Sequence, residues 1–242
     1  MNTIDLLLSH HSVRQFSGQS ITEETLQRLI AGAQAAPTSH YVQAYSIIGI
    51  TDPALKQALA AISGQAHALN NARLLVFIAD FNRHAELLED KQHLGSAENL
   101  LVAAIDASLA AQNLCIAAES LGIGCCYLGS LRNQVAEIIR LLELPRFTFP
   151  LFGIALGYPT VDADSEQKPR LPMAEIYHQN RYDSRERARH LADYDAQVQA
   201  YYAARARGQK NQQWTTQMRD FFSRPRRQEI ADVLQSQGFW QL

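Results

Sequence analysis

One long apolar segment limits the folds that this chain can adopt. Residues 97–121 form the longest periodic run, with apolar side chains on nearly every face and alanine at eight positions. A helix that is apolar all round is either buried in a core or spans a membrane. Asp106, Gln112 and Asn113 argue against a membrane, because one carboxylate costs about 2.5–3.5 kcal/mol at a bilayer centre. The segment predicts a fully buried core helix, whose small side chains let another helix, including its copy in a dimer, approach closely.

Shorter apolar runs predict the strands of a sheet. Residues 74–80 are apolar and bounded by polar side chains, as in a buried strand. Helical spacing behind a capping residue or a proline marks further helices. Predicted strands cover residues 46–50, 74–80, 125–129 and 149–157, and predicted helices cover 4–8, 22–33, 54–62, 97–121, 184–207, 214–222 and 226–237. Because the predicted helices and strands do not alternate strictly along the chain, the sequence predicts an α+β fold.

The composition is typical of a cytoplasmic globular protein. Of 242 residues, 47% are hydrophobic and 19% charged, which provides for a sizeable core. Three cysteines, two of them adjacent at Cys125 and Cys126, cannot form a disulfide framework and suit a reducing compartment. The first nine residues lack the basic and apolar regions of a signal peptide. We therefore expect a cytoplasmic protein that does not span a membrane.

Charge is distributed unevenly along the chain. Residues 1–167 hold 9 basic and 16 acidic side chains, whereas residues 168–242 hold 13 basic and 8 acidic ones. Of the 22 cations, 18 are arginine, whose guanidinium binds phosphate through two hydrogen bonds. No nucleic-acid-binding motif accompanies the basic tail. We expect a phosphorylated small molecule as ligand rather than nucleic acid.

Several common active-site motifs are missing from the sequence. It contains no Gly-x-Gly-x-x-Gly turn after a strand, no Walker loop and no Gly-x-Ser-x-Gly elbow. His10 and His11 are adjacent, but no cysteine or carboxylate stands at a metal-ligand spacing from them. The common nucleotide folds are disfavoured, and no metal site is expected.

Two short basic clusters are candidates for an anion site. His10, Ser12 and Arg14 place an imidazole, a hydroxyl and a guanidinium within five residues, which suits an anion. The alternative is a helix C-terminus whose carbonyl groups attract cations. Lys168 and Arg170 flank a proline and form the second cluster, for which the alternative is a solvated loop. Taken alone, these residues leave both alternatives open.

The order of several motifs along the chain is more specific than any one of them. They are His10-x-Ser12-x-Arg14, Pro37-Thr38-Ser39, Gly64-Gln65, Gly122-Ile123-Gly124 before Tyr127-Leu128-Gly129, and Lys168-Pro169-Arg170-Leu171-Pro172. This order resembles the FMN-dependent nitroreductase family, and within it the NADPH-preferring oxygen-insensitive nitroreductase and flavin reductase P branch. The resemblance extends from about Ile4 to Trp240.

The resemblance implies a fold and an activity. The fold is a single α+β nitroreductase-like domain over residues 1–242, with a central, mostly antiparallel sheet flanked by helices and a helical excursion at 184–237. The protein is an obligate homodimer with FMN at each of two subunit interfaces. Hydride passes from NADPH through FMN to a nitroaromatic, quinone or flavin acceptor in a ping-pong cycle. The alternative is a non-catalytic FMN-binding sensor or carrier.

The resemblance also implies roles for individual residues. Arg14 lies beside the N1 and O2 edge of the flavin and stabilises the charge of the reduced ring, so no side chain acts as a general acid or base. The implied FMN-binding residues are His10, His11, Ser12, Lys168 and Arg170 around the phosphate, Thr38 and Ser39 in their loop, Gln65 at the pyrimidine end, Tyr127 lining the pocket, and Leu128, Gly129 and Ser130 near N5.

The basic tail is implied to bind NADPH. Arg205 corresponds to an arginine that holds the 2′-phosphate, with Arg207 and Lys210 close by, and Arg224 corresponds to one near the substrate face. The alternative for these residues is a solvated helix.

Three residues depart from the pattern of this branch. His11 stands where arginine is common, His40 replaces a small hydroxyl that faces the substrate, and Ser130 replaces a glycine of the flavin loop. His40 narrows the mouth of the implied site and adds a group that titrates near neutral pH.

Overall fold

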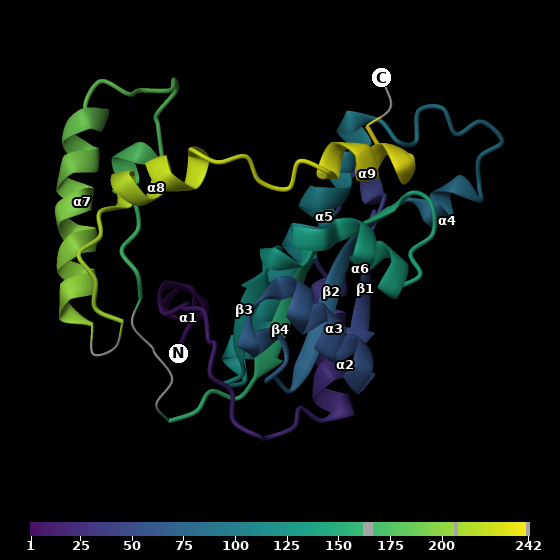
Figure 1. Cartoon of the computed structure of the whole chain (residues 1–242), viewed down its shortest axis with the longest axis horizontal. Coiled ribbons are helices and arrows are strands. Elements are labelled where there is room, and N and C mark those ends of the chain that lie inside the picture. The colour runs from purple at the N-terminus through teal and green to yellow at the C-terminus, as the bar shows by residue number, and fades with distance from the viewer. Residues whose placement is uncertain (162–166, 206–207, 241–242) are drawn as a thin grey trace. The chain divides into compact units, whose positions relative to one another are not determined.

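The chain consists of two compact parts, which we describe separately (Figure 1). The computed structural model describes residues 1–161, 167–205 and 208–240. The first unit comprises Met1–Ser165 together with Arg227–Leu242, and the second unit comprises Glu166–Arg226. The expectation of a single domain over the whole chain stays a prediction.

A four-stranded antiparallel sheet forms the centre of the first unit. Its strands are β1 (Tyr45–Ile50), β2 (Arg73–Asp80), β3 (Gly124–Leu128) and β4 (Thr148–Gly157), in the order β1-β2-β4-β3. All three pairings are antiparallel, with Ile47 opposite Phe77 and Cys126 opposite Ala155. The four predicted strands and the antiparallel α+β architecture are confirmed.

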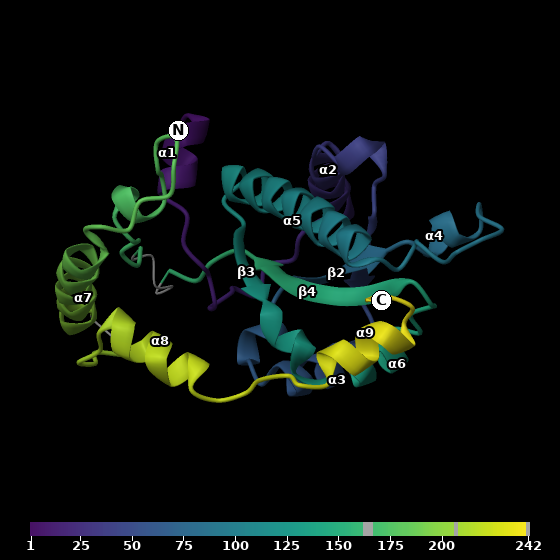
Figure 2. The ribbon, with the colours of Figure 1, turned by 90° about the horizontal axis from the view of Figure 1, so that it is seen from above.

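Helices cover both faces of this sheet (Figure 2). On one face, α2 (Glu23–Gln34) and α5 (Ala97–Ser120) pack on Leu75 and Phe77. On the other face, α3 (Pro53–Ser63) and α6 (Val135–Leu141) pack on the alternate β2 residues, Leu74, Val76 and Ile78. Successive side chains of a strand point to opposite faces, so a strand covered on both faces is apolar throughout. This explains the continuous apolar run at 74–79, which Asp80 ends.

Helix α5 is the long helix that the sequence predicts, but in the single chain it is not fully buried. Its N-terminus is capped by Ser96 Oγ, which accepts a hydrogen bond from Asn99 N at 3.2 Å. Ala103, Ala107, Ala110 and Ala111 are buried, whereas Leu101, Ile105 and Leu109 are exposed, Ile105 by 55%. These three leucine and isoleucine residues recur every four positions and share one face. The expectation of full burial is therefore wrong for one chain, because no described element of the first unit covers this face.

In length and apolar character, α5 alone among the described helices could cross a membrane. Its opposite face packs on α2 and on the sheet, and its buried Asp106 hydrogen-bonds to backbone groups of the same unit. We therefore interpret α5 as a core helix of the first unit rather than a membrane span.

The remaining helices of the first unit are short. They are α1 (Thr3–Leu8), α4 (Asn82–Ala85) and α9 (Ile230–Ser236). The sequence does not predict α4 or α6, which are short and have no side-chain cap at the N-terminus that would mark their start. The predicted helix at 226–237 begins at Ile230 instead, since Arg227 adopts a left-handed backbone with φ of 53°.

The second unit is built on two helices, α7 (Arg187–Ala204) and α8 (Trp214–Phe222), after a 3₁₀ turn at Met173–Glu175. Tyr194, Val198 and Tyr202 of α7 form a small core with Trp214, whose ring meets that of Tyr194 edge-on at 5.8 Å. The predicted helix at 214–222 is confirmed. The one predicted at 184–207 begins at Arg187, and its last two residues lie outside the described ones.

Gly124 lets the N-terminal segment approach the sheet. A Cβ atom at Gly124 would lie 2.5 Å from Cγ2 of Val13, which is buried against β3. Val13 N also donates a hydrogen bond to Cys125 O at 3.0 Å. The Gly122-Ile123-Gly124 motif therefore places residues 10–14 beside β3.

Replacing Gly124 by alanine is expected to destabilise the first unit by about 1–3 kcal/mol, because overpacking forces Val13 or the strand to move. Thermal unfolding followed by circular dichroism measures the effect. Gly18→Ala is the matched control, since no atom lies within 4 Å of a Cβ at Gly18. Equal melting temperatures for the two variants would contradict this role of Gly124.

Candidate active site

The segment that contains His10, Ser12 and Arg14 runs alongside the sheet. Besides the bond from Val13 N to Cys125 O, Ser17 N donates to Tyr158 O at 2.7 Å, and Phe16 forms an antiparallel bridge with Pro159. These backbone contacts fix the segment between the start of β3 and the end of β4.

Two histidines of this segment have defined contacts. His10 Nδ1 lies 2.5 Å from Glu119 Oε1 near the C-terminus of α5, and both side chains are largely buried. His11 Nδ1 donates to Ser9 O at 3.1 Å, just after α1. His11 therefore makes the contact expected at a helix C-terminus, whereas His10 is held by a carboxylate 109 residues away. A phosphate contact from the His10 ring has to use Nε2.

Arg14 lies near a buried pair formed by His67 and Cys126. His67 Nε2 lies 3.4 Å from Cys126 Sγ. Burial, and then the positive charge of Arg14, lower the pKa of His67 below its ordinary value. Gln65 stands two residues before His67, at the start of the 3₁₀ turn Ala66–Ala68. The structure thus brings Arg14 and the Gln65–His67 segment to the same part of β3.

The cysteines beside this region are packing residues. Cys125 and Cys126 are buried, and burial raises the pKa of the Cys126 thiol. The hydrogen bond with Cys115 and burial raise that of Cys125 as well. A thiol with a raised pKa is a poor nucleophile, as the sequence indicates.

The end of β3 leads into the residues expected near the flavin N5. Leu128 is the last residue of β3, and a 3₁₀ helix covers Gly129–Gln134. In the described part of the chain no group hydrogen-bonds to the buried Ser130 Oγ. Tyr127 is partly exposed and donates from its hydroxyl to Gln112 Oε1 at 3.3 Å. A buried hydroxyl without a partner is the kind of group that a ligand can satisfy.

The loop with Thr38, Ser39 and His40 lies against a different part of α5. Ser39 N donates to Asp106 Oδ1 at 3.0 Å, and Ala44 N donates to Asp106 Oδ2 at 3.1 Å. Asp106 stands thirteen residues before Glu119, which corresponds to about 20 Å along a helix. Within one chain, this loop and the His10 segment are therefore held at separate points of α5.

Lys168 and Arg170 belong to the second unit, where they line a cavity of about 290 Å³ beside α7 and α8. Arg170 Nη1 donates to Lys168 O at 2.7 Å, and Lys168 Nζ lies 5.7 Å from the centre of the Tyr202 ring. Burial alone raises the pKa of Tyr202, but the hydrogen bond from Lys168 and the charges of Lys168, Lys210 and Arg205 lower it below its ordinary value. Lys168, Lys210 and Arg205 therefore all lie near the Tyr202 side chain.

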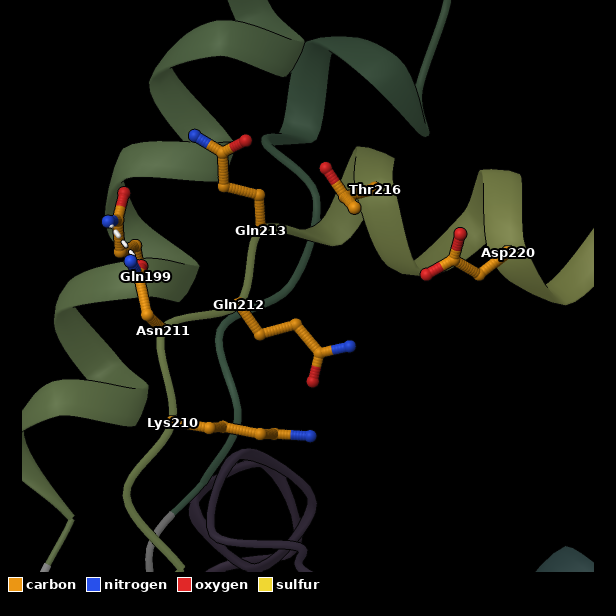
Figure 3. A pocket seen from close by; sticks show the side chains of 7 residues that line it. All are labelled: Gln199, Lys210, Asn211, Gln212, Gln213, Thr216 and Asp220. Carbon is orange, nitrogen blue, oxygen red and sulfur yellow. Dashed lines mark hydrogen bonds between the residues drawn. The ribbon is translucent and has the colours of Figure 1, made fainter.

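The basic residues of the tail surround the same helices. Lys210 Nζ lies 4.4 Å from the centre of the Tyr202 ring, and Arg205 Cζ lies 5.9 Å from that of Tyr201. Lys210 also lines a polar pocket of about 450 Å³, in which amide side chains and Asp220 surround an open space (Figure 3). Arg224 lines a different, exposed pocket after α8. Arg207 lies outside the described residues.

Comparison with known proteins decides the family. The profile of the nitroreductase family matches residues 7–158, and that of the nitroreductase family C-terminal domain matches residues 168–241. The chain belongs to the nitroreductase family.

Relatives in this family match along nearly the whole chain. A protein of Staphylococcus saprophyticus named "NADPH-dependent oxidoreductase" is 44% identical, covering 97% of this chain and 96% of its own. One of Bacillus subtilis named "FMN reductase (NADPH)" is 41% identical, covering 98% of this chain and 98% of its own. The structure of NfrA1 from B. megaterium has a TM-score of 0.94 at 40% identity, covering 99% of both chains. The nitroreductase fold is thereby confirmed.

Four further residues of this nitroreductase lie next to the predicted site residues. They are buried or partly buried, and the sequence did not single them out as site residues. Glu119 holds His10, His67 lies near Arg14, Asp106 holds the loop of Ser39, and Tyr202 lies among the cations of the tail. Glu119, His67 and Asp106 meet their partners across long stretches of sequence, so no local motif marks them, whereas Tyr202 is near Arg205 and Lys210 in the sequence as well. A charged residue within the apolar run at 97–121 was the available signal, and it points to Asp106 and Glu119 as well as to Glu98 at the start of the run.

Proposed function

We propose that this nitroreductase is an FMN-dependent oxidoreductase that takes hydride from NADPH and reduces nitroaromatic, quinone or flavin acceptors. The observation that carries the proposal is the placement of Arg14 and the Gln65–His67 segment beside β3, in a chain that matches NADPH-dependent relatives along its length. The site offers hydrogen-bond donors and positive charge. Such a donor set suits a cofactor that brings its own redox chemistry.

The residues of the first unit fit FMN in chemical type. His10 and Ser12 offer an imidazole and a hydroxyl to a phosphate, and charge-assisted hydrogen bonds are the strong ones for such a dianion. The buried Ser130 Oγ offers an unsatisfied polar group at the end of β3. Lys168 and Arg170 remain predicted ligands of the FMN phosphate. Thr38, Ser39 and Gln65 remain predicted contacts of the flavin ring.

Arg14 supplies the positive charge of the proposed site. When bound, FMN supplies the hydride acceptor and donor that no side chain can provide. A guanidinium beside N1 and O2 favours the ring when it carries negative charge, which favours two-electron over one-electron chemistry. The burial of His67 and the charge of Arg14 lower the pKa of His67, which favours its neutral form beside Arg14.

We propose that the functional form is a homodimer that forms through α5. The exposed face of Leu101, Ile105 and Leu109 is the kind of apolar surface that a second copy covers. The separation of the Ser39 loop from the His10 segment along α5 supports the same arrangement, because one FMN can then contact the loop of one subunit and the segment of the other. Each site is completed across the interface.

The second candidate function is a flavin-binding sensor or carrier without turnover. It predicts that FMN binds and that NADPH has no effect on it. Arg205 and Lys210 beside Tyr202 favour the enzyme, because a carrier needs no site for a pyridine nucleotide. Free thiols at Cys115, Cys125 and Cys126 support a cytoplasmic location.

Arg205→Ala is expected to raise the KM for NADPH and to leave NADH kinetics nearly unchanged. The two donors differ by the 2′-phosphate, and one charge-assisted contact contributes about 1.5–3 kcal/mol to kcat/KM. Added salt shrinks the preference for NADPH, since exposed charges are screened. Arg189→Ala on α7, the helix that Arg205 directly follows, is the control. Equal losses with both donors would contradict a role of Arg205 at the 2′-phosphate.

FMN binding tests the proposal at its first step. The purified protein is expected to be yellow, with one FMN per subunit, and the apoprotein is expected to take up FMN with quenching of flavin fluorescence. A colourless protein that takes up no FMN on reconstitution would exclude both the enzyme and the carrier.

A further inference from the structure

The loop between α2 and β1 has a backbone that its residues do not favour. His40, Tyr41 and Gln43 have φ values of 47°, 60° and 54°, in the left-handed region. This region is unfavourable for non-glycine residues, above all for bulky ones such as tyrosine. Such residues persist only where the surrounding structure fixes them, and they cluster at functional sites. Something must therefore hold residues 38–44 in this shape.

Asp106 provides that support from α5. Its side chain is fully buried, and its two carboxylate oxygens accept from the amides of Ser39 and Ala44. These amides flank the three left-handed residues, so one carboxylate ties both ends of the loop to one helix. His84 Nε2 adds a contact to Val42 O at 2.9 Å in between. His40 and Tyr41 are left exposed on the opposite side.

We propose that Asp106 is a positioning residue of the active site, which sets the shape of the loop that carries Thr38, Ser39 and His40. The inference rests on the proposed function, in which Thr38 and Ser39 contact FMN and His40 faces the acceptor. Asp106 acts through the loop and touches neither ligand. The requirement is for a carboxylate, because two amide donors need two acceptor oxygens.

The adjacent residue gives this support a second consequence. Ile105 lies on the exposed face of α5, and Asp106 follows it toward the buried side. The same turn of helix thus holds the loop and contributes to the proposed subunit interface.

Asp106→Asn tests the proposal with little change in size. An asparagine offers one oxygen and one NH₂ group, so one of the two amides faces a donor and loses its acceptor. Hydrogen exchange in the apoprotein is expected to speed up about tenfold or more at Ser39 and Ala44, and not in β2. The Kd for FMN is also expected to rise about tenfold in this variant, because the loop that contacts FMN is less well ordered before binding.

Asp195→Asn is the matched control. Asp195 is a buried carboxylate that also accepts two hydrogen bonds, from the backbone amide and hydroxyl of Thr215, but it lies in the second unit. Exchange at Ser39 and Ala44 stays unchanged in this variant if the effect of Asp106→Asn is local. An equal effect of both variants on these amides would overturn the proposal.

The unmodified protein provides a test that does not depend on a folded variant. The amides of Ser39 and Ala44 are expected to exchange about as slowly as strand amides, although both lie outside regular strands. Fast exchange at these amides would overturn the support by Asp106, whether or not FMN binds. Faster exchange in Asp106→Asn with an unchanged Kd for FMN would overturn its role in the site. Failure of the unmodified protein to bind FMN would instead overturn the proposed function.

Discussion

Replacing Ile105 by glutamate is expected to leave the protein as a monomer that does not retain FMN. Ile105 lies at the centre of the exposed apolar face of α5, between Leu101 and Leu109. Burying an unpaired carboxylate at this point makes the free energy of dimer formation less favourable by several kcal/mol. The remaining contacts of the interface are not expected to compensate for this loss. Light scattering is expected to give about the 27.1 kDa mass of one chain rather than twice that value.

Leu87→Glu is the control for this effect. Leu87 is 80% exposed in the segment after α4, so a charge there remains in water. This variant is expected to stay dimeric and yellow. A dimeric Ile105→Glu protein that binds FMN would show that the subunits do not meet through this face. A monomer that keeps FMN would show that each site lies within one chain.

Replacing Arg14 by alanine is expected to have the largest effect on the reaction itself. If its guanidinium stabilises the reduced ring, kcat/KM for NADPH falls by roughly 10-fold to 100-fold, equivalent to about 1.5–3 kcal/mol. The flavin reduction potential falls in the same variant, because the reduced state loses more stabilisation than the oxidised one. Arg14→Lys keeps the charge and recovers part of both quantities, whereas Arg28→Ala on α2 changes neither.

His67 reports on Arg14 independently of activity. The charge of Arg14 contributes to the lowered pKa of His67, so its removal raises that pKa toward the ordinary value. A proton NMR titration of the apoprotein measures the change. A pKa of His67 that stays the same in Arg14→Ala would contradict the placement of the guanidinium near His67. Normal kcat/KM would contradict its role in the reaction.

The sequence predicts the sheet well because local pattern determines its strands. Residues 74–79 are apolar throughout, and the structure covers both faces of this strand with α2, α5, α3 and α6. Helix α6 is missed because it is short and has no side-chain cap at the N-terminus that would mark its start. The start of α9 is misplaced because the left-handed conformation of Arg227 depends on its environment, which includes a hydrogen bond from its side chain to Asn133.

The site is predictable only in part, since its residues come together through long-range contacts. His10, Ser12 and Arg14 are recognisable as a motif, and the structure explains Gly124 as the residue that lets their segment approach β3. No local pattern joins His10 to Glu119 or Ser39 to Asp106, because these pairs are 109 and 67 residues apart. The long apolar helix indicated a dimer, but only the structure shows which of its faces is left uncovered.

Hydride transfer between NADPH and the bound flavin is the central claim, and anaerobic stopped-flow absorbance measures it most directly. Mixing the FMN-loaded protein with one equivalent of NADPH is expected to bleach the flavin band near 450 nm. A second mixing with a quinone or nitroaromatic is expected to restore it in a separate step. A flavin band that NADPH leaves unchanged in the loaded protein would contradict the oxidoreductase and identify a flavin carrier or sensor.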